Sequence, residues 1–160
     1  MNRLYAATLA VALASCTPNG IGSTGGGGTG GGVLHTIDIN LTVYGNATNT
    51  PYGQGAGFKP LVINVNVGDT VAFKNADSFA HTATLIPPGK TTNETQFPSQ
   101  YPFSGSALSQ SGTTLSAGWS SGELQASSTS QTITVDKAGT YLYGCAIHYG
   151  APMRGAIVAQ

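Results

Sequence analysis

The segment AGTYLYGCAIHYGAPMRGAIVA, residues 138–159, decides how the whole chain is interpreted. Its two ends are typical of strands, and the Gly- and Pro-containing middle is typical of a loop. Within the loop, Cys145, His148 and Met153 follow the spacing Cys-x2-His-x4-Met. The chain has only two cysteines, two methionines and three histidines, and this short loop contains one of each.

A thiolate, an imidazole and a thioether together form a soft ligand set. Zinc prefers further thiolate or imidazole ligands, and thioether is a poor ligand for it. Soft sulfur with imidazole suits copper, and a trigonal His2Cys site with a weak axial Met is the arrangement of blue-copper electron-transfer sites. The loop therefore predicts a copper site that needs a second histidine from elsewhere in the chain.

Two histidines could complete the site. His35 follows a glycine-rich segment at the start of the first expected strand, whereas His81 follows a turn at the start of another strand. A ligand must be held rigidly, and strand pairing holds a residue better than a neighbouring flexible segment does. We therefore expect His81 to be the fourth ligand, with His35 as the alternative.

Period-two alternation of apolar and polar residues predicts strands along most of the chain. In HTIDINLTVY, residues 35–44, alternate apolar residues would share one face. No stretch of ten or more residues has a helical period with convincing caps. The segment 89–128 is long and irregular, and the pattern places no element in it. The other expected strands are LVINVNV (61–67), TVAFKN (70–75), AHTATLI (80–86), two strands within QTITVDKAGTYLYGC (131–145), and RGAIVA (154–159).

Short strands separated by Gly, Pro and Asn turns predict an all-β fold, an antiparallel Greek-key β-sandwich. We expect this domain to cover residues 33–160.

Three segments resemble the cupredoxin family, with plastocyanin and pseudoazurin as the most similar branch. GDTVAFKNADSFAHTAT (68–84) resembles the family's turn, strand and first histidine, and WSSGEL (119–124) resembles the segment before its penultimate hairpin. Residues 138–159 resemble its closing strand, ligand loop and last strand, with the plastocyanin-type loop spacing. The resemblance covers most of residues 36–160 and implies one type 1 copper per chain.

The resemblance also implies a role for each site residue. Cys145, His81 and His148 would lie in the metal plane, with Met153 as the weak axial donor. His148 would reach the surface, within a small apolar docking patch of Tyr149, Ala151 and Pro152. The list of implied ligands is His81, Cys145, His148 and Met153.

The sequence departs from the family pattern at three positions. Thr82 stands where many members have an asparagine that bonds across to the cysteine loop, and its hydroxyl could make one such bond. Gly144 precedes the cysteine, where a bulky residue is common, and Pro152 stiffens the loop before the methionine. Because hydrogen bonds around a ligand tune its metal, we expect these changes to affect the reduction potential more than the choice of metal.

The composition limits the classes of partner. Only 8% of the 160 residues are charged, with six basic and six acidic side chains. No basic run is present, so nucleic acid is not expected as a partner. Docking should rest on local shape and apolar contact, with weak electrostatic steering and a weak dependence on ionic strength.

The N-terminus, MNRLYAATLAVALASC, is typical of an export signal rather than a membrane-spanning helix, because its apolar run is short. LASC at its end resembles the bacterial lipoprotein box, which implies cleavage after residue 15 and lipidation of Cys16. An ordinary secretory signal is the alternative. The next segment, 17–32, is dominated by glycine and is expected to be a flexible tether. We thus expect a signal at 1–15 and a lipid-anchored tether at 16–32.

Together, these features predict a membrane-tethered protein that carries single electrons between redox partners outside the cytoplasmic membrane. Its location would be the periplasm or cell surface, with the outer membrane favoured because Thr17 follows the cysteine. Expected partners are cytochromes or a terminal oxidase or reductase, and the chain is expected to be a monomer and not an enzyme. The alternatives are a copper-delivery protein and a metal-free adhesion sandwich.

Overall fold

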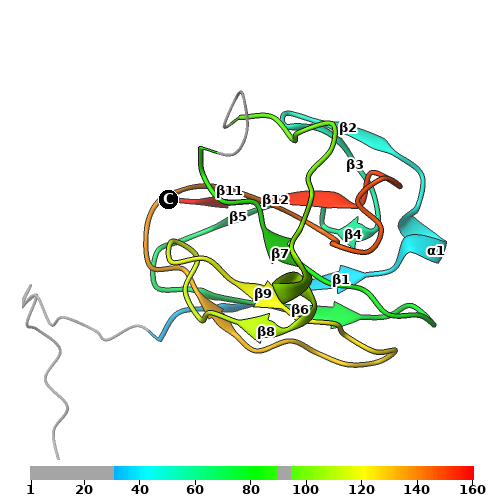
Figure 1. Ribbon diagram of the computed structural model, residues 1–160. Helices are drawn as coiled ribbons and strands as arrows, with labels where there is room; N and C mark the ends of the chain where they lie inside the picture. Colours follow the sequence, from blue (N-terminus) through cyan, green and yellow to red (C-terminus); the bar gives the residue numbers. More distant parts are fainter. Residues whose placement is uncertain (1–30, 90–94) are drawn as a thin grey trace, which may run out of the picture.

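The computed structural model describes residues 31–89 and 95–160, and these form a β-sandwich (Figure 1). The predicted signal (1–15), Cys16 and nearly all of the predicted tether lie outside the described residues. Among the described residues, no helix is long and apolar enough to cross a bilayer. The elements are β1 (Leu34–Ile39), α1 (Leu41–Tyr44), β2 (Thr48–Thr50), β3 (Gly53–Gly55), β4 (Phe58–Lys59), β5 (Val62–Val65), β6 (Thr70–Asn75), β7 (Thr84–Leu85), the 3-10 helix η1 (Gly105–Leu108), β8 (Gln110–Ser111), β9 (Ser120–Ser121), β10 (Ile133–Thr134), β11 (Gly139–Gly144) and β12 (Arg154–Ala159).

Two sheets form the layers of the sandwich. One has the strand order β10-β6-β1-β4, and the other has the order β5-β12-β11-β7-β9-β8. A small separate pair, β2-β3, lies beside them. The predicted all-β sandwich is confirmed, but the sheets are mixed: β1 pairs with β6 in parallel, and β5 pairs with β12 in parallel. Alternation has period two in both kinds of pairing, so the sequence pattern could not distinguish them.

The strand predicted over residues 35–44 was wrong in its second half. β1 ends at Ile39, and α1 follows as a single helical turn. The side chain of Asn40 caps this turn by accepting a hydrogen bond from the backbone N–H of Val43 at 2.8 Å. The Asp77 carboxylate accepts the N–H of Leu41 at 2.7 Å, so side chains satisfy the donors that start the turn.

The expected strand 80–86 is also shorter than the pattern suggested. Only Thr84–Leu85 belongs to a sheet ladder, while His81 forms an isolated bridge with Leu124. The irregular segment 89–128 contains η1, β8 and β9. RGAIVA is confirmed as β12 over its full length.

A cluster of four aromatic side chains occupies the core between the sheets. The rings of Phe58 and Phe73 meet Tyr143 edge-on at centroid distances of 4.9 and 5.2 Å, and Trp119 stacks on Phe73 at 5.2 Å. Each such pair contributes about 0.5–1.5 kcal/mol beyond burial of area. Because Tyr143 precedes Cys145 by two residues, this cluster fixes the end of β11 from which the ligand loop begins.

The C-terminus and the loops that contain His81 and Cys145 lie at opposite ends of the sandwich. Val67 donates to the carbonyl of Gln160 at 3.0 Å, so the C-terminus lies beside the turn that precedes β6. The loops that follow β6 and β11 lie at the opposite end (Figure 1). His81 and Cys145 are therefore brought to one pole, remote from the point where β1 begins.

Candidate metal centre

Three of the predicted ligands converge at this pole. Sγ of Cys145 lies 3.9 Å from Nδ1 of His81 and 3.6 Å from Nδ1 of His148. The two Nδ1 atoms lie 3.1 Å apart. The ligand atoms of these three side chains all lie within 4.8 Å of one another, so together they are arranged to hold a metal ion.

The spacing of the three donor atoms fits one small ion. A metal with bonds of roughly 2.0–2.3 Å to N and S in a trigonal plane would place its donors roughly 3.5–3.7 Å apart. The observed separations of 3.1, 3.6 and 3.9 Å scatter around this value. One thiolate and two imidazoles are donors that suit copper.

Cys145 is held by hydrogen bonds from both sides of the site. Its buried sulfur accepts the backbone N–H of Thr82 at 3.4 Å, and its own N–H donates to the Met153 carbonyl at 3.0 Å. The Thr82 hydroxyl accepts the N–H of Ala146 at 2.8 Å. Thr82 therefore makes the one cross-loop bond expected of its hydroxyl and ties the His81 loop to the Cys145 loop.

His81 is fully buried and points its second nitrogen at a carboxylate. Its Nε2 lies 3.1 Å from Oδ2 of Asp77. An Nε2–H that donates to this carboxylate leaves the lone pair of Nδ1 directed at the site, which is how a neighbouring carboxylate orients a ligand histidine. Burial lowers the pKa of His81 below its ordinary value, although the Asp77 hydrogen bond opposes that shift. The neutral imidazole that a metal requires is thus favoured.

Asp77 is itself held in place by several donors. Its carboxylate accepts the hydroxyl of Thr42 at 2.8 Å, and the N–H groups of Thr42 at 3.1 Å and of Ser78 at 2.8 Å. Burial raises the pKa of this carboxyl, but the hydrogen bonds from Thr42, Ser78 and His81 outweigh burial and hold the pKa well below its ordinary value. A buried carboxylate thus stays charged because donors surround it.

The sequence pattern did not predict this role of Asp77. An Asp four residues before a His predicts a side-chain contact only within a helix. Residues 76–80 form an irregular loop, so the spacing did not predict the contact between Asp77 and His81. Only the fold shows that the carboxylate turns inward.

Met153 belongs to the same buried core cluster as Cys145. The side chain is fully buried, and the residue forms a parallel bridge with Ala56. Gly57, with φ of +74°, lies against it: a Cβ added there would come within 2.8 Å of Met153 Cγ. The glycine therefore supplies the space that the thioether occupies.

One departure from the family pattern, Gly144, has a structural explanation in the ligand loop. A Cβ on Gly144 would lie 2.6 Å from the Tyr149 ring, so the space of a bulky residue is filled by that ring instead. The Tyr149 hydroxyl donates to the Pro98 carbonyl at 2.9 Å, and the Arg154 guanidinium lies 4.3 Å from the ring centroid. Burial raises the pKa of Tyr149 to about 12. The Tyr149 ring therefore has a packing role in the ligand loop.

The predicted docking patch must be redrawn around His148. Ala151 is exposed and Pro152 is half-buried, but Tyr149 is only 6% exposed and presents almost no surface. Ile147 and Phe79 are 44% and 41% exposed. The Phe79 ring lies 4.7 Å from the His81 ring and 5.5 Å from the His148 ring, so it covers the site from outside. Nothing in the sequence pattern predicted that these two side chains would be exposed.

The alternative ligand His35 lies away from this site. Its Nε2 is 2.9 Å from Oδ2 of Asp69, near the start of β1. His81 is the histidine that the fold brings to Cys145.

The family described as copper binding proteins, plastocyanin/azurin family, matches residues 47–160. The chain belongs to this family. The match covers His81, Cys145, His148 and Met153, and the cupredoxin centre of this chain holds a single copper ion. No curated protein matches the sequence significantly.

Solved cupredoxin structures match this chain at low sequence identity. A purple cupredoxin from Nitrosopumilus maritimus is 20% identical, with a TM-score of 0.46 over 78% of this chain and 98% of its own. Auracyanin from Roseiflexus castenholzii is 15% identical, with a TM-score of 0.48 over 82% and 99%. Plastocyanin from Dryopteris crassirhizoma is 18% identical, with a TM-score of 0.46 over 79% and 100%.

Proposed function

We propose that this cupredoxin carries single electrons between redox partners and is not an enzyme. The observation that carries the proposal is the preformed donor set: His81 and Cys145 are fully buried, while His148 is partly exposed beside apolar surface. Copper bound here would supply a one-electron couple between its cupric and cuprous forms. A buried, rigid donor set keeps both forms in one geometry and gives a partner a short approach through a single imidazole edge.

The residues around the donors restrict movement and water. Thr82 fixes the Cys145 loop, Asp77 fixes the His81 ring, and Gly57 leaves room for Met153. Phe79 packs against the rings of His81 and His148 and keeps solvent from their outer faces. Burial of the donors argues against the copper-delivery alternative, because a delivery site must open to pass its metal to another protein.

Partners would dock on the apolar surface around His148, formed by Phe79, Ile147, Ala151 and Pro152. We propose that these partners are cytochromes or a terminal oxidase or reductase. We also propose that this chain acts as a monomer. For location, we propose that Cys16 is lipidated and that the tether holds the domain in the periplasm or at the cell surface, with the outer membrane favoured. LASC at the end of a short apolar run supports this placement.

Copper loading and redox cycling test the proposal. The cupric protein should show an intense visible absorption that a reduced c-type cytochrome bleaches rapidly and completely. Cys145→Ser should abolish this absorption, and His81→Ala should lower copper retention. A metal-free adhesion protein would show neither effect. Rapid loss of cuprous ion to a chelator, faster than exchange of electrons, would instead support delivery.

Lipidation is tested separately in a bacterial host that processes lipoproteins. Wild-type protein should incorporate labelled fatty acid and sediment with membranes, whereas Cys16→Ser should do neither. Equal sedimentation of the two proteins would contradict the anchor without affecting the copper proposal.

A further inference from the structure

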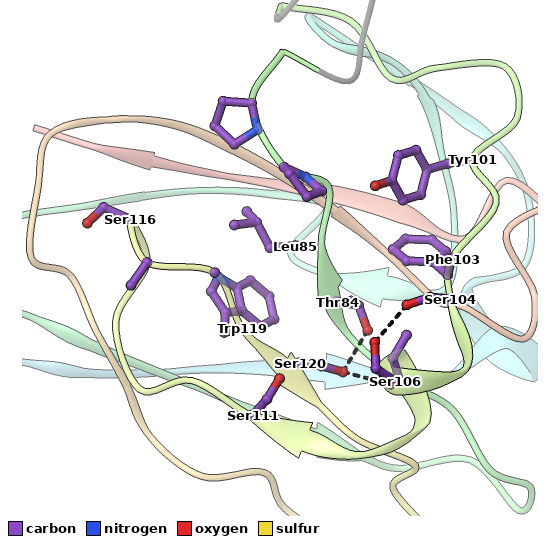
Figure 2. A pocket seen from close by; sticks show the side chains of 15 residues that line it. Thr84, Leu85, Tyr101, Phe103, Ser104, Ser106, Ser111, Ser116, Trp119 and Ser120 are labelled. Atoms are coloured by element: carbon purple, nitrogen blue, oxygen red, sulfur yellow. Dashed lines mark hydrogen bonds between the residues drawn. The ribbon is translucent and has the colours of Figure 1, made fainter.

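A second site lies beside β7 and β9, away from the copper ligands. A cavity of about 330 Å3 opens between residues 84–88, 101–107 and 111–120 (Figure 2). We call it the serine pocket. None of His81, Cys145, His148 and Met153 lines it. Its volume is at the lower end of the roughly 300–1,000 Å3 typical of small-molecule sites.

The lining of the serine pocket is neutral and rich in hydroxyl groups. It contains five serines, one threonine and one tyrosine, and it contains no Asp, Glu, Lys, Arg, His or Cys. Figure 2 shows the hydroxyl-bearing side chains of Thr84, Ser104, Ser106 and Ser120 gathered at one end, with Leu85 and Trp119 in the middle and Ser116 at the far end. The pocket therefore combines hydroxyl groups with apolar side chains along its length.

Several of these hydroxyls can accept or donate further hydrogen bonds. Ser120 is saturated, since its Oγ donates to Ala107 at 2.7 Å, accepts from Gly122 at 3.1 Å and also contacts Thr84 at 2.8 Å. The side-chain hydroxyls of Tyr101 and Ser111, however, have no hydrogen-bond partner among the described residues that line the pocket or surround it. A hydroxyl offers one donor and two acceptor positions, so these two remain available to a ligand.

The Ser104 and Ser106 hydroxyls bond to each other at 2.6 Å, which leaves each with unused capacity. The rings of Tyr101 and Phe103 meet edge-on at 4.6 Å and form an aromatic wall beside these hydroxyls. An aromatic wall next to available hydroxyls matches a molecule with C–H groups on one face and hydroxyl groups at its edge.

We propose that the serine pocket binds a neutral sugar ring. Without a charged group in the lining, the pocket offers nothing to compensate for the desolvation of an anion or a cation. A purely apolar ligand would leave the Tyr101 and Ser111 hydroxyls without partners, which costs binding free energy. A neutral carbohydrate satisfies both kinds of lining, because its hydroxyls bond to the serines while its C–H face packs on the aromatic and aliphatic side chains. This site is independent of the electron-transfer proposal.

The single tryptophan of the chain provides a direct reporter. Trp119 lines the pocket, and the sequence contains no other tryptophan, so one indole resonance reports on the site. The probes are neutral glucose, galactose, mannose and maltose, compared with anionic glucuronate, cationic glucosamine and the apolar cyclohexanol. They are titrated into the full-length, copper-loaded protein in its reduced, diamagnetic form, and backbone and indole resonances are recorded.

We expect at least one neutral sugar to shift the Trp119 indole and its pocket neighbours in the millimolar range. The charged sugars and cyclohexanol should bind at least tenfold more weakly. Tyr101→Phe keeps the ring and should weaken binding about fivefold through loss of one hydrogen bond. The matched control Tyr44→Phe removes a hydroxyl outside the pocket and should bind like wild type.

Ala117 is exposed in the pocket lining, so Ala117→Phe should fill the site without disturbing the core and should abolish binding. An unchanged melting temperature and visible spectrum would show that this variant is folded and holds copper. No shift with any neutral sugar at tens of millimolar, or equal binding of cyclohexanol, would overturn the proposal. Sugar binding that survives in Ala117→Phe would overturn the assignment to this pocket.

Discussion

The Asp77 carboxylate lies 3.1 Å from Nε2 of His81, and both side chains are buried. The same carboxylate accepts the N–H of Leu41 at the start of α1. One side chain thus links the first metal ligand to a helical turn far away in the sequence. A negative charge held behind a ligand histidine stabilises the more positive state of the metal on its other side.

Asp77→Asn should therefore raise the reduction potential. Removing the charge weakens cupric binding more than cuprous binding, by about tenfold, which corresponds to about 60 mV for a one-electron couple. Voltammetry of the copper-loaded variant measures the shift. The amide also turns a donor toward the N–H groups of α1, so the free energy of unfolding of the copper-free protein should fall by about 1–3 kcal/mol.

Asp38→Asn is the matched control for this prediction. Asp38 is a partly buried aspartate of β1, so the variant loses the same charge without touching His81. Its reduction potential should stay close to wild type. Equal potentials in wild type and Asp77→Asn would show that the carboxylate only supports the loop.

Thr82→Val should loosen the cysteine loop. Valine keeps the shape of threonine but leaves the Ala146 N–H without the acceptor that lies 2.8 Å away, and unpaired groups of this kind cost about 1–3 kcal/mol. Thermal unfolding of the copper-free protein measures the loss, and the visible band should broaden as the Cys145 sulfur becomes less well positioned. Thr36→Val, at an exposed position on β1, should change neither property. A sharp, unshifted band in Thr82→Val would exclude a role in positioning.

Gly57→Ala separates backbone strain from crowding of the methionine. Gly57 and Gly68 both have positive φ, +74° and +98°, and alanine in this region costs about 1–2 kcal/mol. At Gly57 the new methyl would also lie 2.8 Å from Met153 Cγ, whereas at Gly68 nothing lies within 4 Å. Both variants should lose stability in denaturant unfolding, but only Gly57→Ala should shift the visible spectrum of the copper protein. The same spectrum in both would show that Met153 does not influence the site.

The sequence predicted His81, Cys145 and His148, which the fold brings together, because metal binding demands particular side chains, and these stand out in a chain with few sulfur atoms and histidines. The choice of His81 over His35 followed from the need for a rigidly held ligand. The supporting residues could not be predicted in this way. The Asp77 carboxylate accepts the N–H of Leu41 at the start of a helical turn, whereas alternation of Leu41 and Val43 fits a strand equally well.

Side-chain packing around the ligand loop was equally inaccessible from the pattern. Gly144 replaces the bulky residue common in the family because the Tyr149 ring folds back over this position and fills the space. That fold-back buries Tyr149 and removes it from the docking surface, while Phe79 and Ile147 remain exposed. Hydrophobicity alone cannot tell which apolar loop residues are covered, since folded proteins leave many of them in solvent.

Acid stability should depend on Asp69. Its carboxylate accepts the N–H of Asn66, the side chain of His35 and the N–H of Val33, and these bonds lower its pKa from 3.8 to about 2. Because the pKa is lower in the folded state, the stabilisation is complete above pH 3.8 and is lost as the pH falls toward about 2. Asp69→Asn should be less stable at neutral pH and should show a flatter fall of stability across this window. Urea unfolding at a series of pH values measures both effects, and parallel curves for the two proteins would contradict the assignment.

Electron exchange should depend on the apolar surface around His148. Ile147 is 44% exposed in the ligand loop, and Val67 is 49% exposed at the opposite pole. Ile147→Asp places a charge where a partner must exclude water, so the second-order rate with a reduced c-type cytochrome should fall about tenfold or more. Val67→Asp adds the same charge at a similarly exposed position and should leave the rate unchanged. Stopped-flow measurements over a range of salt concentrations also test the weak ionic-strength dependence expected of a wild-type surface with few charges. Equal slowing by the two substitutions would mean that net charge, rather than the surface around His148, governs the encounter.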